Sequence, residues 1–400
     1  MHYGTKKMTF LAAAAGFLLA GGPPVAAADE DLTELRRQME QLVYQNQQLT
    51  KRMVEIEAEL RGARAVARAE QESVAAGGAE GEDAAGQIGE YVTLSGTIEV
   101  EAATGEDFSG ESFTDASLAT AEIGLDVQMS EWASGHMLIT YEDDALTIDE
   151  AFVILGDGEE MPASLSAGLF YVPFGSFETA MLQDPLTLEI GEIRAAGVGL
   201  DLGLAGLGAA VYAYKGMNEM DVADTVGVGA RLSYELEFDP VGIAAGMSWV
   251  SNIGDSGGIT GYLDEMGAEG IEDQVGGFGA DIMITFGPVT MIGEYVQALD
   301  SFAELEFAGG AAEPKAWSLE AVYSTAFGEK DTTFAIGVQG TDEATALGLP
   351  EQRAIAAASM MILPATTLTL EYYHDEDYGV DDGGTGESAD VLTTQLRYEF

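Results

Sequence analysis

Apolar and polar residues alternate along most of the chain after residue 90. In the segment 226–238, every second residue from Val226 to Phe238 is apolar, and the residues between them are Gly, Arg, Ser or Glu. A period of two places apolar side chains on one face of a β-strand and polar side chains on the other. The pattern therefore predicts a strand here. Similar segments recur at 91–102, 118–129, 135–142, 146–155, 165–172, 196–203, 208–215, 241–251, 276–286, 288–298, 316–326, 332–340, 352–362, 366–375 and 391–400.

An even set of about ten-residue strands is typical of a single-chain transmembrane β-barrel, in which closure leaves no strand edge facing lipid. We therefore expect an all-β transmembrane barrel of about 16 antiparallel strands over residues 90–400. Long acidic or glycine-rich connections, such as 252–275, 299–315 and 376–390, follow most odd-numbered strands. Short turns, such as Asp239-Pro240, follow most even-numbered ones.

This asymmetry predicts long loops outside the cell and both chain ends in the periplasm. Only the tight third connection, 143–145, departs from it. A soluble β-sandwich with a coiled-coil stalk would also alternate, but its strands should vary more in length and lack the loop asymmetry.

Aromatic residues are placed as a membrane barrel requires. The last strand, 391–400, ends on Phe400 and carries an apolar face, which is similar to the assembly signal of outer-membrane proteins. Amphipathic rings suited to the two membrane interfaces follow the same strands. These predicted girdle residues are Tyr234, Trp249, Tyr295, Trp317, Tyr323, Tyr372 and Tyr398. Packing in the girdle explains them better than ligand binding does.

The first residues predict export. Lys6 and Lys7 precede an apolar run over 10–20, and an Ala-x-Ala cleavage site lies just before Asp29. We therefore expect a secretory signal peptide over 1–28, and an outer-membrane location in a Gram-negative bacterium.

Residues 30–61 change to a heptad pattern, with apolar residues stepping by three and four from Leu32 to Leu60. This pattern predicts a periplasmic coiled-coil helix, followed by a flexible linker over 62–89 that is rich in Ala, Gly and Glu. Asn46 stands at an a position, where an amide fixes register and oligomer number, so we expect a homo-oligomer. Packing of the helix against its own chain is the alternative. The predicted seam consists of Leu35, Met39, Leu42, Asn46, Leu49, Met53 and Ile56.

Charge limits the range of partners. The chain carries 16 basic and 69 acidic residues, a formal net charge of −53. Nucleic acid is therefore excluded as a partner by repulsion. The acidity indicates either a strongly solvated surface in a saline habitat or a path that prefers cations.

Enzymatic chemistry has little support in the residues. There are no cysteines, which excludes disulfides and thiolate metal sites, and the three histidines are His2, His136 and His374. No Gly-x-Ser-x-Gly elbow is present. The acidic stretch 375–382 does not have the spacing of an EF-hand loop. We therefore expect no enzyme, no cofactor and no resident metal.

The densest local motif is Gly168-Leu-Phe-Tyr-Val-Pro-Phe-Gly-Ser-Phe-Glu-Thr-Ala-Met181, followed by Asp184-Pro-Leu-Thr-Leu-Glu-Ile-Gly-Glu-Ile-Arg194. It occupies the third outside loop, and loops of this length are usually functional. The segment resembles the corresponding one of LbtU-type outer-membrane siderophore porins, a likeness that extends to the signal peptide, helix, linker and barrel. It also resembles general sixteen-stranded porins, whose third loop folds inward. The first resemblance implies plug-free uptake of an iron–siderophore complex.

By the same likeness, the third loop would line a pore constriction, where charged and aromatic side chains select the solute. A loop that only caps the barrel mouth is the alternative. The residues predicted for the constriction are Phe174, Phe177, Glu178, Asp184, Glu189, Glu192 and Arg194. The polar faces of the strands would offer further charged groups to the lumen, where ordinary solvation explains any one of them better than ligand contact. These are Glu122, Asp126, Arg231, Glu235, Glu294, Glu320, Arg353, Glu371 and Arg397.

The sequence therefore predicts an outer-membrane channel for passive uptake of a small solute, with an iron–siderophore complex as the substrate that the resemblance implies. A nonselective cation-leaning diffusion porin is one alternative. A structural barrel that ties the outer membrane to the envelope through its coiled coil is the other.

Overall fold

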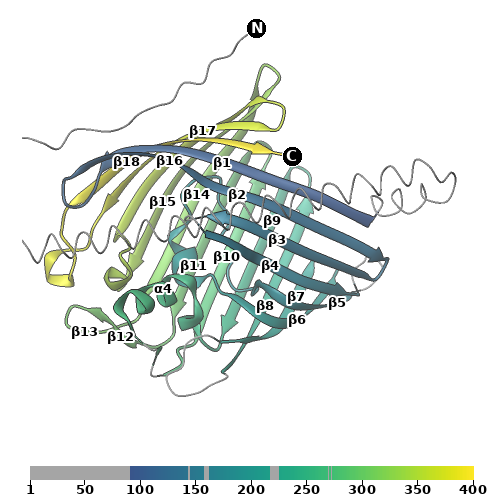
Figure 1. Cartoon of the computed structure of the whole chain (residues 1–400), viewed down its shortest axis with the longest axis horizontal. Helices are drawn as coiled ribbons and strands as arrows, with labels where there is room; N and C mark the ends of the chain where they lie inside the picture. Colours follow the sequence, from purple (N-terminus) through teal and green to yellow (C-terminus); the bar gives the residue numbers. More distant parts are fainter. Residues whose placement is uncertain (1–90, 143–144, 157–161, 217–224, 269, 272) are drawn as a thin grey trace, which may run out of the picture. The chain divides into compact units, whose positions relative to one another are not determined.

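The alternating segments form a closed β-barrel in the computed structural model (Figure 1). The structure describes residues 91–400, apart from 143–144, 157–161, 217–224, 269 and 272. The predicted signal peptide, coiled coil, oligomer seam and linker lie outside the described residues and stay predictions.

All sixteen predicted strands are confirmed, because each barrel strand overlaps one predicted segment. Their bounds are β1 (Val92–Glu106), β2 (Ser112–Ser130), β3 (Ala133–Glu142), β4 (Ala145–Leu155), β5 (Ala163–Tyr171), β6 (Arg194–Leu204), β7 (Leu207–Lys215), β8 (Val226–Phe238), β9 (Val241–Val250), β10 (Gly277–Phe286), β11 (Val289–Ala298), β14 (Lys315–Phe327), β15 (Lys330–Asp342), β16 (Gln352–Leu363), β17 (Thr366–Glu376) and β18 (Ser388–Glu399).

Each strand pairs antiparallel with its neighbours, and β1 pairs with β18, so the described sheet has no free edge. Figure 1 shows this closure, with β1 in blue beside the yellow β18. The first two strands are longer than their predicted segments, since the hairpin pairs up to Glu106–Ser112. Residues 103–106 and 112–117 are rich in small and polar side chains, which hid the alternation.

The two faces of the wall separate as the alternation predicts. Leu232 and Tyr234 of β8 are exposed on the outer face, whereas Arg231 and Ser233 point into the lumen. The predicted girdle rings share the outer face and are largely exposed there, apart from the half-buried Tyr295. Among the helices that the structure describes, none is long and apolar enough to span a bilayer.

The long loops contain short elements that the period of two did not predict. They are α3 (Leu186–Gly191), η1 (Ile253–Asp255), α4 (Gly257–Met266), β12 (Phe302–Phe307), β13 (Gly310–Ala312), η2 (Thr345–Leu347) and η3 (Val380–Asp382). The largest set of buried apolar side chains lies among these loops and the adjoining strand ends. We call nine of its loop members the loop cluster, namely Leu186, Ile190, Ile193, Ile253, Ile259, Leu263, Ile271, Phe302 and Leu305.

Candidate functional site: an inward loop bound to the lumen wall

Residues 172–193, which we call the inward loop, connect β5 to β6. Tyr171 and Arg194 are direct cross-strand partners, so the loop starts and ends at adjacent positions on the barrel wall. Between them, its backbone binds side chains on strands far around the barrel, from β8 to β17. The loop therefore contacts lumen-facing side chains well beyond the two strands that it joins.

Glu294 of β11 is the first wall carboxylate that holds the loop. Its Oε1 accepts the Ser176 N–H at 2.6 Å, and both of its oxygens accept the Phe177 N–H at 3.2 Å. The Thr187 hydroxyl donates to Oε2 at 2.8 Å, so both arms of the loop share this carboxylate. Hydrogen bonds to an ionised acceptor are about twice as strong as neutral ones.

Two more carboxylates continue the line of acceptors. Glu320 of β14 accepts the Thr179 hydroxyl at 2.7 Å and the Ala180 N–H at 2.9 Å. Glu371 of β17 accepts the backbone N–H groups of residues 182–183. Free backbone donors buried in a lumen would be costly, and these side chains supply their acceptors.

Neutral groups complete the attachment. Ser248 of β9 accepts the Gly175 N–H at 3.1 Å, and Gln339 of β15 accepts the Leu186 N–H at 3.0 Å. The guanidinium of Arg231 donates to the Gly175 carbonyl at 2.8 Å. The loop is thus bound to β8, β9, β11, β14, β15 and β17, a span that fixes its path across the lumen.

The local sequence bends the chain inward. Gly175 and Phe177 both adopt positive φ, +77° and +55° respectively, which reverses the backbone within three residues. A Cβ on Gly175 would lie 2.4 Å from the Phe177 ring, so only glycine fits there. The strained Phe177 backbone persists because its N–H is bound to Glu294 and its ring packs against Gly175 and Gly191.

The residues predicted for the constriction occupy three environments. Phe174 is buried, with 1 % of its surface exposed, and Phe177 is half-buried, so both support the loop. Glu178 and Asp184 are exposed, and Glu189 and Glu192 are half-buried. Arg194, at the start of β6, donates to the carbonyls of Ile148 and Asp149 at 3.0 Å, which ties it to β4.

Glu192 carries an unusual protonation equilibrium. Burial raises the pKa of its carboxyl to about 7 from 4.5, and the negative charges of Asp184, Asp149, Glu189 and Glu150 add to the rise. Burial and Asp184 also raise the pKa of Glu189. The charge of the loop near Glu192 therefore changes close to neutral pH.

The basic residues predicted for the lumen are each paired with a carboxylate. Arg231 lies 2.7 Å from Asp281, and Arg353 makes two 2.8 Å bonds to Asp375. Arg397 lies 3.2 Å from Glu99 of β1. Pairing cancels much of their positive charge, so they contribute little to the attraction of anions.

Three further acidic residues were predicted for the lumen, namely Glu122, Asp126 and Glu235. Asp126 lies 2.7 Å from His136. In the sheet, Glu122 of β2 stands opposite Thr97 of β1 on one side and Thr140 of β3 on the other. Glu235 lies on β8, on the same face as Arg231.

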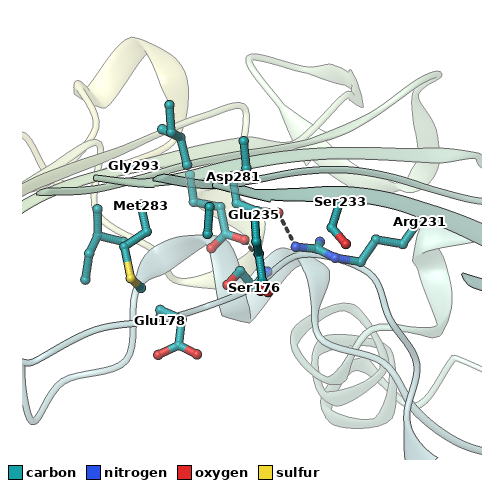
Figure 2. A pocket seen from close by; sticks show the side chains of 13 residues that line it. Ser176, Glu178, Arg231, Ser233, Glu235, Asp281, Met283 and Gly293 are labelled. Carbon is teal, nitrogen blue, oxygen red and sulfur yellow. Dashed lines mark hydrogen bonds and ion pairs between the residues drawn. The ribbon is translucent and has the colours of Figure 1, made fainter. Parts of the chain in front are cut away.

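A cavity of about 290 Å³ lies between the inward loop and the wall of β8–β11. Figure 2 shows Glu178 on the loop and Asp281 and Glu235 on the neighbouring strands, with Arg231 turned toward Asp281. The lining holds four carboxylates and one guanidinium, on an apolar floor that includes Met283. Within the part of the chain that the structure describes, Glu178 and Glu235 have no hydrogen-bond or ion-pair partner.

Several residues of the site were not predicted from the sequence. Ser248, Asp281, Gln339 and Asp375 all bind the loop or a lumen arginine. The period of two was the available signal, because each shares the lumen face of its strand. Asp375, for example, stands four residues after Glu371 on β17, at the end of the predicted strand 366–375.

The two described histidines each pair with a carboxylate, His136 with Asp126 and His374 with Asp390 at 2.8 Å. Across residues 91–400, with the stated gaps, no group of three or more His, Asp or Glu side chains is arranged to hold a metal ion.

No protein-family model matches the chain. A UPF0422 protein of Coxiella burnetii is 31% identical over 311 residues, which cover 74% of this chain and 66% of that protein. A UPF0422 protein of Legionella pneumophila is 27% identical over 361 residues, which cover 77% of this chain and 66% of that protein. The chain thus spans just under two thirds of the length of these curated relatives.

Solved porins share the fold at low identity. Pseudomonas putida OprB matches with a TM-score of 0.56 at 9% identity, over 79% of this chain and 96% of that one. The Acinetobacter baumannii outer membrane channel DcaP matches with a TM-score of 0.53 at 14% identity, over 77% and 97%. An anion-selective porin of Comamonas acidovorans matches with 0.54 at 14%, over 77% and 99%. At these identities the likeness shows that the described chain has the barrel fold of porins.

Proposed function

We propose that this chain is a passive outer-membrane channel for small solutes, narrowed by the inward loop and selective for cations. The observation that carries the proposal is the attachment of the loop to Glu294, Glu320 and Glu371 inside a closed sixteen-stranded barrel. A barrel that only anchored the envelope would need no loop bound across its lumen. The porin-like fold supports the outer-membrane location.

The charges in the lumen favour a preference for cations, which the fold alone does not decide. A porin described as anion-selective has the same fold. Here Arg231, Arg353 and Arg397 are paired with carboxylates, whereas Glu178 and Glu235 face the cavity without partners in the described residues. Unpaired carboxylates along a narrow path attract cations and repel anions.

The test is reconstitution of the refolded protein in planar bilayers under a KCl gradient. We expect a conductance whose reversal potential favours K⁺, and we expect the preference to weaken in the double variant Glu178→Gln, Glu235→Gln. The matched control is Glu329→Gln, which removes the same charge from the short β14–β15 turn. Absence of conductance would refute the channel. A preference for chloride, or an unchanged preference in the double variant, would refute the role of the two carboxylates.

The iron–siderophore substrate rests on the resemblance to LbtU-type porins alone. Growth of a deletion strain under iron limitation tests it, because a siderophore channel should be needed there. Normal iron uptake together with reduced small-solute permeability would leave the cation-selective porin. A strain lacking residues 30–61 tests the envelope-tethering alternative, which predicts envelope defects with intact flux.

A further inference from the structure

We propose that α4, from the β9–β10 loop, is a clamp that holds the inward loop in place by packing against α3. We propose further that Gly258 is the positioning residue that allows the two helices to pack this closely. This inference rests on the proposed function, since it concerns the loop that narrows the channel. α4 lies at the same end of the barrel as the β12–β13 hairpin (Figure 1).

The first contact joins the ends of two helices. The Gly257 N–H, at the start of α4, donates to the Glu192 carbonyl at 2.9 Å, just beyond the end of α3. Free N–H groups begin every helix and free carbonyls end it, so each helix satisfies a backbone group of the other. The helix dipoles meet positive end to negative end, which adds to the attraction.

Gly258 makes the closest approach of the two backbones. A Cβ built on this residue would lie 2.1 Å from the Glu189 carbonyl oxygen and 3.0 Å from its carbon. Both are main-chain atoms of α3, so neither can rotate away as a flexible side chain would. Any residue larger than glycine at 258 must push α4 and α3 apart.

Apolar side chains fill the remaining contact. Ile259 and Leu263 of α4 and Ile190 of α3 each expose 2 % of their surface or less within the loop cluster. Separation of the helices would expose these side chains, and each buried aliphatic side chain contributes to holding α3 down.

α3 connects the clamp to the constriction. Thr187, in its first turn, donates to the same Glu294 carboxylate that accepts the Ser176 and Phe177 N–H groups. Displacement of α3 therefore disturbs the acceptor of residues 176–177, which Gly258 does not touch. The α3–α4 contact and the wall carboxylates therefore both restrain the inward loop.

The test uses the alanine variant Gly258→Ala with two controls in the same helix. A Cβ on Gly257 or Gly261 meets nothing within 4 Å, so Gly257→Ala and Gly261→Ala make the same chemical change without the overlap. Amide hydrogen exchange of the folded barrel should become about tenfold faster over residues 176–183 in Gly258→Ala, and stay unchanged in both controls. Single-channel records of the same variant should show more frequent conductance transitions.

A second pair of variants keeps the proposal falsifiable where Gly258→Ala does not fold. Leu263→Ala removes a buried side chain from the α3–α4 contact, and Met266→Ala truncates an exposed one on the same helix. We expect faster exchange over 176–183 for the first only. Wild-type exchange over 176–183 in Gly258→Ala, or in Leu263→Ala, overturns the clamp while leaving the channel intact. A wild-type protein without conductance refutes the proposed function, and the exchange result still decides the clamp.

Discussion

Individual side-chain hydrogen-bond acceptors on the wall determine the path of the inward loop. Glu294 receives three donors from both arms of the loop, and its side chain exposes only 8 % of its surface. The two backbone N–H donors are partly buried, so losing this acceptor removes charge-assisted hydrogen bonds that water replaces only in part. Glu294 is therefore the residue whose loss should release the loop most.

Replacing Glu294 with alanine should lower the local stability of residues 176–177 by about 2 kcal/mol, which corresponds to roughly thirtyfold faster amide exchange. Hydrogen exchange of the folded barrel followed by mass spectrometry measures this. The matched control is Glu122→Ala, which removes a carboxylate from β2 that does not bind the loop. Equal exchange at residues 176–177 in the two variants would show that Glu294 does not hold the loop.

The raised pKa of Glu192 predicts a pH dependence. A carboxyl with a pKa of about 7 is charged above that pH and neutral below it, so cation preference should fall as the pH is lowered from about 8 to about 6. Reversal potentials across that range measure it. Glu192→Gln should remove the step, whereas Glu329→Gln should keep it. A step that survives in Glu192→Gln would assign the titration to another group.

The same shift has a consequence for stability. The pKa of Glu192 in the folded chain lies above its ordinary value of 4.5, so the folded loop binds the proton more tightly than an unfolded one. Stability from this group is complete below pH 4.5 and is lost as the pH rises through about 7. The contribution of Glu192 alone therefore favours the folded loop more at low pH than above neutrality, and Glu192→Gln should remove this contribution.

At the scale of elements, the strands could be predicted and the loop elements could not. A strand such as β8 reveals itself through its own alternation, and its neighbours follow from closure of the barrel. The six residues of α3 have no such pattern, since nearly all of their stability comes from packing against α4, β11 and β14. The β12–β13 hairpin is equally short.

The path of the inward loop was beyond sequence reasoning for a related reason. Alternation placed Glu294, Glu320 and Glu371 in the lumen, but it gave no partner for them. Ser176 and Glu294 are 118 residues apart in the chain, and Leu182 and Glu371 are 189 apart. Contacts of that separation appear only once the barrel has closed. Likewise, no pattern near residue 258 predicts that a glycine is required there, because the requirement comes from the Glu189 carbonyl in another loop.

Across the whole molecule, the acidic residues occupy several different environments. Glu294, Glu320 and Glu371 are buried acceptors for a loop, and Asp281 and Asp375 pair with arginines. Glu178 and Glu235 line the lumen cavity, while Asp381 and Asp382 lie in the β17–β18 loop. A formal charge of −53 is therefore only partly a surface property. In the proposed channel, the carboxylates in the lumen are the part of this charge that would act on an ion.

Single-channel conductance with and without the inward loop tests the constricted channel most directly. Because Tyr171 and Arg194 are cross-strand partners, an Asn-Gly turn can replace residues 172–193 and leave the strands paired. In the control, the same turn replaces residues 107–111, between the paired Glu106 and Ser112. We expect the loopless barrel to conduct more than the wild type and to lose cation preference, and the control to match the wild type. Equal conductance in all three, or none in the wild type, would contradict a channel narrowed by this loop.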